Sequence, residues 1–126
     1  MQRVMLKSKI HRARVTGSDL HYIGSLTVDP KLLAAADILE HERITVVDVD
    51  NGARFETYAI AGEPDSGAIE VNGAAARLVH HGDTIIVFSY GHYDEDEVSR
   101  QAPRVVHVDE RNRIVTVDER ASTLAT

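Results

Sequence analysis

Short runs of alternating apolar and polar residues dominate this chain. Residues 3–15 alternate in this way, which predicts a strand with one buried face. A second apolar run covers residues 44–49, and the Asp50-Asn51-Gly52 segment that follows has the chemistry of a tight turn with positive φ. Residues 54–60 are then expected to form the returning strand of a hairpin. Further short strands are expected at residues 68–71, 84–89, 105–108 and 114–117.

Helix signals are few and short. Asp29 supplies an N-cap and Pro30 suits a first helical position, so a brief helix is predicted over residues 31–36. Residues 72–78 predict a turn that enters a second brief helix. The chain has 15 valines and 9 isoleucines against 8 leucines, a balance that favours strands. We therefore expect a mainly β fold, a small β-barrel or sandwich with a few short helices.

Composition narrows the class of protein. A length of 126 residues predicts one domain, and 43% hydrophobic with 27% charged residues is typical of globular proteins. The lack of cysteine excludes disulfides, thiolate metal sites and a thiol nucleophile. A formal charge of −6 argues against phosphate-driven binding of nucleic acid. No apolar run approaches a membrane span and the N-terminus lacks a signal peptide's apolar region, so we expect a cytoplasmic protein.

The charged segment at the end of the chain differs from the rest. Residues 94–126 carry 8 acidic residues and 5 arginines. We expect most of this stretch to be peripheral and its end to be mobile. Its Asp94–Glu97 run lacks the glycine and the spaced ligands of a calcium loop, which favours a solvated acidic face.

The histidines do not form a metal-binding pattern. Seven are present, but none are spaced as the ligand pairs of a metal site usually are. His80 and His81 are adjacent, so on a strand they would point to opposite faces. No phosphate-binding glycine loop is present either. From these patterns we expect no metal.

An ordered set of motifs resembles one enzyme family. The set comprises Lys9-Ile10-His11-Arg12, Asp19-Leu20-His21-Tyr22-Ile23-Gly24-Ser25, residues 51–60 (NGARFETYAI), residues 71–76 (VNGAAA) and His81-Gly82-Asp83. Over residues 1–90 it resembles the pyruvoyl-dependent aspartate 1-decarboxylases. The resemblance implies a double-psi β-barrel and a homotetramer with active sites between neighbouring subunits.

The resemblance also implies a self-processing reaction. The chain would break between Gly24 and Ser25 into residues 1–24 and 25–126, and Ser25 would become a covalently bound pyruvoyl group. This group replaces pyridoxal phosphate as the electron sink. L-Aspartate would form a Schiff base with it and be converted to β-alanine and CO2, which would supply pantothenate and coenzyme A biosynthesis.

The same motifs assign the residues that handle the substrate. Tyr58 stands at the family's proton-donor position, although a strand tyrosine alone would more often be packing. Arg54 is suited to binding a substrate carboxylate through two hydrogen bonds, and Lys9 would add positive charge. Thr57 is expected to stabilise the oxyanion during cleavage and to contact substrate, while β-propensity alone would also explain it.

A second group of residues is expected to support processing and binding. Asn72 would be a polar partner at the cleavage site, where a turn asparagine is the simpler interpretation. Gly73, Ala74 and Ala75 would present backbone N–H groups to the substrate near a helix start, where anions are favoured.

Several alternatives stay open from the sequence. His11 and Tyr22 are equally consistent with ordering the site and with a structural role. A non-catalytic β-barrel interaction module would keep Ser25 intact, and another pyruvoyl-dependent decarboxylase would act on a different amino acid. The sequence also leaves open whether cleavage is spontaneous or needs an accessory maturation protein.

Overall fold

The computed structural model describes residues 1–22 and 24–119. Within this part of the chain a single sheet contains β1 (Gln2–Arg14), β2 (Gly17–Asp19), β3 (Ser25–Val28), β4 (Arg43–Asp48), β5 (Arg54–Ala61), β6 (Ile69–Asn72), β7 (Thr84–Asp94), β8 (Arg104–Val108) and β9 (Ile114–Asp118). The helical elements are α1 (Pro30–Ala35), α2 (Glu95–Val98) and the 3-10 helix η1 (Gly73–Arg77). The prediction of a mainly β protein with a few short helices is confirmed.

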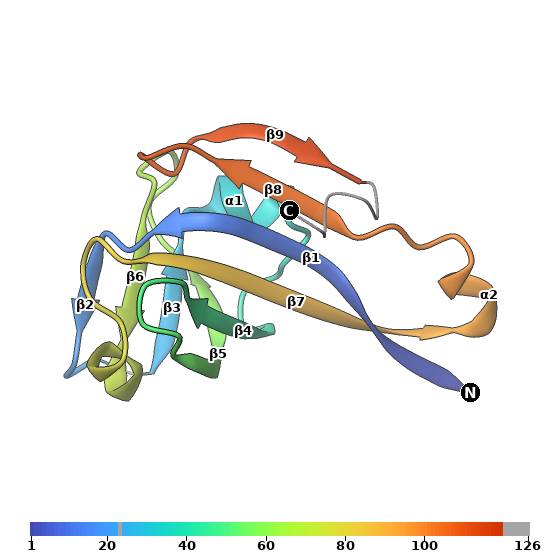
Figure 1. Cartoon of the computed structure of the whole chain (residues 1–126), viewed down its shortest axis with the longest axis horizontal. Helices are drawn as coiled ribbons and strands as arrows, with labels where there is room; N and C mark the ends of the chain where they lie inside the picture. Colours follow the sequence, from blue (N-terminus) through green and yellow to red (C-terminus); the bar gives the residue numbers. More distant parts are fainter. Residues whose placement is uncertain (23, 120–126) are drawn as a thin grey trace.

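The strand order is β2-β6-β3-β5-β4-β7-β1-β8-β9. β1 and β7 are the longest strands and pair antiparallel along almost their whole length, with the N-terminus at one far end of this pair (Figure 1). Parallel pairs also occur, between β1 and β8, β2 and β6, and β3 and β5. Because parallel neighbours need crossover connections, the chain is not a simple meander.

The segment after β1 connects two sides of the sheet. The N–H of Val15 donates to the carbonyl of Asp83 at 2.9 Å, and the N–H of Thr16 donates to the carbonyl of Ile69 at 2.8 Å. Among the described residues, the outermost strands β2 and β9 do not pair with each other. The sheet is therefore not closed by a continuous hydrogen-bond ladder, and its shape is consistent with a small β-barrel.

The hydrophobic core is built from inward-facing residues of nearly every strand. Ile10, Leu26, Val46, Val71 and Val87 each have an exposed fraction of 0%. Burying a side chain of this size contributes about 1.5–3 kcal/mol of hydrophobic free energy. In β7 the core residues alternate with more exposed neighbours, whereas in β1, β3, β4 and β6 each of these core residues has one buried neighbour along the strand.

Both short α-helices begin with an aspartate cap. The predicted cap at α1 is confirmed, since Asp29 accepts from the N–H of Lys31 at 2.9 Å and Pro30 opens the helix. Asp94 and Glu97 form a reciprocal capping box at α2, so this acidic run caps a helix as well as facing solvent. No helix in the described part of the chain is long and apolar enough to cross a lipid bilayer.

The structure adds strands that the sequence patterns did not predict, and it places part of the charged C-terminal stretch inside the fold. β2 and β3 are too short to show a clear period. β8 pairs with β1, and its Val105 and Val106 have exposed fractions of only 1% and 0%, so this part is not peripheral. The buried Asn112 donates to the carbonyls of Arg14 and Gly67, both at 2.8 Å. The predicted mobile end includes residues 120–126, which lie outside the described residues.

Candidate active site

A pocket of about 500 Å³ opens beside the first half of β5. On the side facing β3, only residues 59–61 of β5 have strand partners, which are residues 26–28. The edge of β5 before residue 59 is therefore uncovered on that side. We call this cavity the edge pocket; it is lined by Gly24, Phe55, Glu56, Thr57, Tyr58, Asn72, Ala74, Ala75 and Leu78.

Ser25 is held beside the edge pocket by a buried amide. The exposed fractions of Ser25 and Asn72 are 2% and 4%, and the two residues lie opposite each other in the β3–β6 pair. The Nδ2 group of Asn72 donates to Ser25 Oγ at 3.1 Å and to Thr27 Oγ1 at 2.9 Å. A serine hydroxyl is thus fixed next to the exposed Gly24 in a site with little water.

Gly73 packs directly against the backbone of Gly24. Its φ of +74° lies in the left-handed region that favours glycine. A Cβ atom at this position would stand 2.6 Å from the Cα and 2.8 Å from the N of Gly24, and 3.2 Å from the carbonyl oxygen of Tyr22. Only a glycine allows η1 to begin this close to the Gly24–Ser25 segment.

Thr57 and Tyr58 both line the edge pocket although their side chains alternate along β5. Tyr58 lies opposite the exposed Arg43 and Thr57 opposite the buried Ile44, so the two side chains point to opposite faces of the sheet. An uncovered strand edge can be reached from both faces, so one pocket contacts both residues. The Tyr58 ring also meets the ring of His41 edge-on, with centroids 6.2 Å apart.

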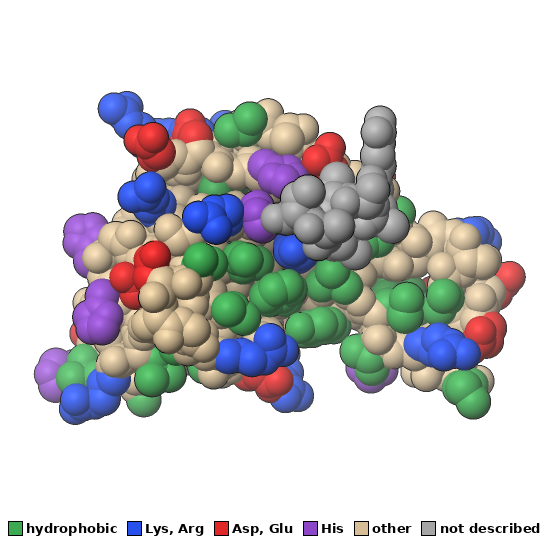
Figure 2. All heavy atoms as spheres, in the orientation of Figure 1, with side chains coloured by type: hydrophobic (Ala, Val, Ile, Leu, Met, Phe, Trp, Pro, Cys, Tyr) green, Lys and Arg blue, Asp and Glu red, His purple; other side chains and the backbone are tan. Residues whose placement is uncertain are grey.

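Lys9 and Arg54 are not among the residues that line the edge pocket. Lys9 is only 8% exposed; it is paired with Phe88 across β1 and β7, and its Nζ stands 5.5 Å from the centroid of that ring. Arg54 is paired with Val47, which is paired in turn with Ile86. Cross-strand partners share a face, so both cations lie on one face of the sheet, together with these apolar side chains and with Thr45 and Glu56. Hydrophobic side chains gather where β1, β4 and β7 cross the molecule (Figure 2).

One known protein family matches this chain. The family sequence model for aspartate decarboxylase matches residues 1–115 of the 126-residue chain. The chain belongs to the aspartate decarboxylase family. A carboxy-lyase is the enzyme class that this membership implies, and the resemblance drawn from the sequence motifs is confirmed at the level of the family.

The residues singled out from the sequence are found in two places in this member of the aspartate decarboxylase family. The edge pocket is lined by six of them, namely Gly24, Thr57, Tyr58, Asn72, Ala74 and Ala75. Ser25 and Gly73 adjoin it through Asn72 and Gly24. Lys9 and Arg54 of the same chain do not line the edge pocket. The chemical roles of all these residues stay predictions.

His11 and Tyr22 differ in their surroundings. Burial, together with the nearby charge of Lys9, lowers the pKa of His11, and its ring lies edge-on to His107 with centroids 5.5 Å apart. The Nδ1 atom of His11 is buried without a hydrogen-bond partner among the described residues. Tyr22 is 52% exposed and reaches the site only through its backbone carbonyl near Gly73.

Some residues at the candidate site were not found from the sequence. Thr27 shares the amide of Asn72 with Ser25, and the spacing of two residues on a strand would have placed both on one face. His41 and Leu78 carry no sequence signal, because only the tertiary fold brings them to Tyr58 and to the edge pocket.

Proposed function

We propose that the protein decarboxylates L-aspartate to β-alanine and CO2, using a pyruvoyl group formed from Ser25 after cleavage of the Gly24–Ser25 bond. The observation that carries the proposal is the buried hydroxyl of Ser25, oriented by Asn72 at 3.1 Å beside a pocket that Gly24 lines. The match to the aspartate decarboxylase family supports the reaction and the substrate. β-Alanine formed in this way would be consumed in the synthesis of pantothenate and coenzyme A.

Cleavage would use groups already in contact. Ser25 Oγ attacks the Gly24 carbonyl carbon, and the peptide becomes an ester as the acyl group moves from nitrogen to oxygen. β-Elimination then breaks the Cβ–O bond, releases the Gly24 carboxylate and leaves dehydroalanine at position 25. Addition of water and loss of ammonia convert that residue to a pyruvoyl group, which stays joined to Leu26 by an amide bond. The amide of Asn72 would hold the attacking oxygen in place, and Thr57 would donate to the oxyanion.

The surroundings of Ser25 fit a reactive group made from its own side chain. The position is 2% exposed, and Asn72 places an amide donor at the hydroxyl oxygen of Ser25 while it also donates to the hydroxyl of Thr27. A pyruvoyl ketone supplies the electron sink that loss of CO2 from an α-amino acid requires. Tyr58 would return a proton to the substrate α-carbon. Ala74 and Ala75 leave room for the substrate and offer backbone N–H groups at the start of η1.

A second copy of the chain would complete the site. Lys9 and Arg54 lie on one face of the sheet with the apolar residues Phe88, Ile86 and Val47, and Arg54 forms no ion pair among the described residues. Burying this face against the edge pocket of a neighbour would deliver both cations to the substrate carboxylates. We therefore propose a homotetramer with its active sites between subunits, as the resemblance implies.

Intact-mass analysis of freshly purified protein tests the proposal. We expect two chains, residues 1–24 and 25–126, with the larger one lighter by one ammonia than simple hydrolysis would leave it. The Ser25→Ala variant should remain a single inactive chain. An intact wild-type chain that persists under activating conditions, with or without candidate accessory proteins, would favour a non-catalytic interaction module.

The choice of substrate needs a separate measurement. CO2 release from L-aspartate should exceed release from L-glutamate, whose side chain is one methylene longer, when both are given to protein shown to carry the pyruvoyl group. A preference for another amino acid would contradict the assignment of aspartate while leaving the pyruvoyl chemistry in place.

A further inference from the structure

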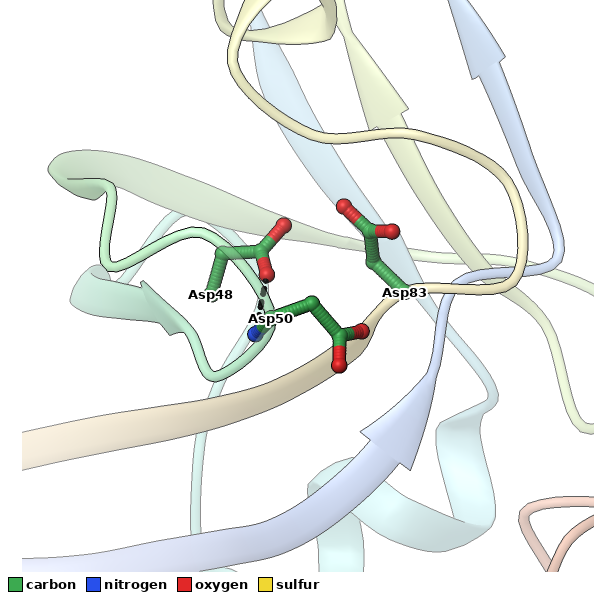
Figure 3. A group of neighbouring side chains, drawn as sticks. All are labelled: Asp48, Asp50 and Asp83. Atoms are coloured by element: carbon green, nitrogen blue, oxygen red, sulfur yellow. Dashed lines mark hydrogen bonds between the residues drawn. The ribbon is translucent and has the colours of Figure 1, made fainter.

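Three carboxylates meet on the side of the fold where the β4–β5 turn contacts the segment before β7. Asp48 ends β4, Asp50 lies in the turn, and Asp83 directly precedes β7 (Figure 3). Each offers an oxygen atom, and these atoms lie within 4.8 Å of one another. The sequence analysis did not connect these residues, since Asp83 is far from the other two along the chain.

Asp48 provides an independent observation at this place. Its exposed fraction is 0%, and its Oδ1 atom accepts from the N–H groups of Asp50 at 2.8 Å and Asn51 at 3.2 Å. Its Oδ2 atom is buried and receives no hydrogen bond within the described part of the chain. A buried carboxylate oxygen without a donor is unfavourable unless a positive charge or a proton compensates it. Figure 3 shows this carboxylate directed toward Asp83.

The other two carboxylates are positioned but not neutralised. Asp50 Oδ2 accepts from the N–H of Thr84 at 2.8 Å, and Asp83 Oδ2 accepts from the N–H of His80 at 3.0 Å. No lysine or arginine of residues 1–22 and 24–119 forms an ion pair with any of the three acids. The exposed His80 lies beside the cluster, with its Nδ1 3.8 Å from Asp83 Oδ2.

We propose that Asp48, Asp50 and Asp83 bind one divalent cation of the kind that prefers carboxylate oxygens, Ca²⁺ or Mg²⁺. The buried Asp48 Oδ2 would be one ligand, and the partly exposed sides of Asp50 and Asp83 leave positions for water. The proposal is independent of the decarboxylase activity, because it concerns binding and stability.

The cation would join two segments that carry the edge pocket. The β4–β5 turn leads into Thr57 and Tyr58, and the segment that contains Asp83 follows η1. The same two segments are already linked by Asn51, whose Nδ2 donates to the carbonyl of Leu78 at 2.7 Å. A cation at the three acids would strengthen this junction by crosslinking it a second time.

A shared proton is the competing explanation. Burial, followed by the neighbouring carboxyl of Asp83, raises the pKa of Asp48. The proton that Asp48 would then offer to Asp83, together with the N–H of His80, holds the pKa of Asp83 below its usual range. A proton between these two carboxyls would satisfy Asp48 Oδ2 without using Asp50 and without any dependence on metal.

Titration of the full chain with CaCl2 and MgCl2 after removal of metals separates the two explanations. We expect calorimetry to detect one site per chain, and Tm to rise with the logarithm of the cation concentration and to fall again with EDTA. Sodium chloride of equal ionic strength should not reproduce the rise. The Asp50→Asn and Asp83→Asn variants keep side-chain size and should each bind at least tenfold more weakly.

Asp96→Asn is the matched control. Asp96 is an exposed acid on α2, which follows the end of β7 opposite to Asp83. The response of this variant to cations should equal that of wild type. The proposal is overturned if wild-type protein shows no binding heat and no change in Tm up to about 10 mM cation, above the weakest class of protein Ca²⁺ sites. An unchanged response in Asp50→Asn would also overturn it. Both results would assign the buried oxygen to a shared proton.

Discussion

Replacing Gly73 by alanine should slow self-cleavage without unfolding the protein. The new Cβ would stand 2.6 Å from Gly24 Cα, so the two backbones must separate by about 0.8 Å to reach the 3.4 Å at which ordinary contact begins. A displacement of roughly 1 Å at reacting groups costs about 10²-fold in rate. We therefore expect the rate of cleavage between Gly24 and Ser25 to fall by about that factor. The positive φ adds a cost of about 1–2 kcal/mol to the folded state.

The matched control is Gly52→Ala. Gly52 has a similar φ of +78°, but a Cβ there would meet nothing within 4 Å. Both variants should lose similar stability from backbone strain, whereas only Gly73→Ala should lose cleavage rate. Stability is measured by urea unfolding in a Ser25→Ala background, so that partial cleavage does not mix two species. Cleavage is followed by mass over time. Equal cleavage rates in the two glycine variants would refute the close-approach argument.

Three further substitutions separate processing from turnover. Tyr58→Phe should cleave normally. β-Alanine formation, measured on protein shown by mass to carry the pyruvoyl group, should fall roughly 10²–10⁴-fold. Near-normal turnover would remove Tyr58 from the mechanism. Thr57→Val nearly keeps side-chain shape but removes a donor, so chain cleavage followed by mass should slow; an unchanged rate would exclude Thr57 as the oxyanion donor. Arg54→Lys should be cleaved normally, but its KM for aspartate should rise roughly tenfold to a hundredfold, because an ammonium group cannot make the planar two-donor contact. Full activity would exclude Arg54 as the residue that binds the substrate carboxylate.

Local chemistry made several elements predictable from the sequence. The Asp29-Pro30 cap and the Asn51-Gly52 turn depend on neighbouring residues, and both occur where they were expected. The alternation of residues 3–15 likewise identified β1 to within one residue at each end. Such features need no knowledge of distant contacts, because a few consecutive residues fix them.

Long-range pairing could not be predicted in the same way. β3 has four residues, and its parallel partner β5 is separated from it by α1 and β4. The edge pocket exists because this pairing stops at Ala59, which no pattern in the sequence records. The motif order identified Gly24, Asn72 and Tyr58 as members of one site through family resemblance rather than through periodicity. Only the structure shows that Arg54 does not line that pocket, since this depends on the strand register.

The position of β1 inside the sheet would have a consequence for a cleaved protein. β1 lies between β7 and β8, whereas Ser25 opens β3 among other strands. If the bond between Gly24 and Ser25 breaks as proposed, residues 1–24 would stay bound through the two ladders of β1 and the short ladder between β2 and β6. Unfolding would then separate two molecules, so the melting temperature of the cleaved form should rise with protein concentration. The uncleaved Ser25→Ala chain would lack this contribution. The proposed self-processing would thus convert a single polypeptide into a heterodimer whose two parts must meet again to refold.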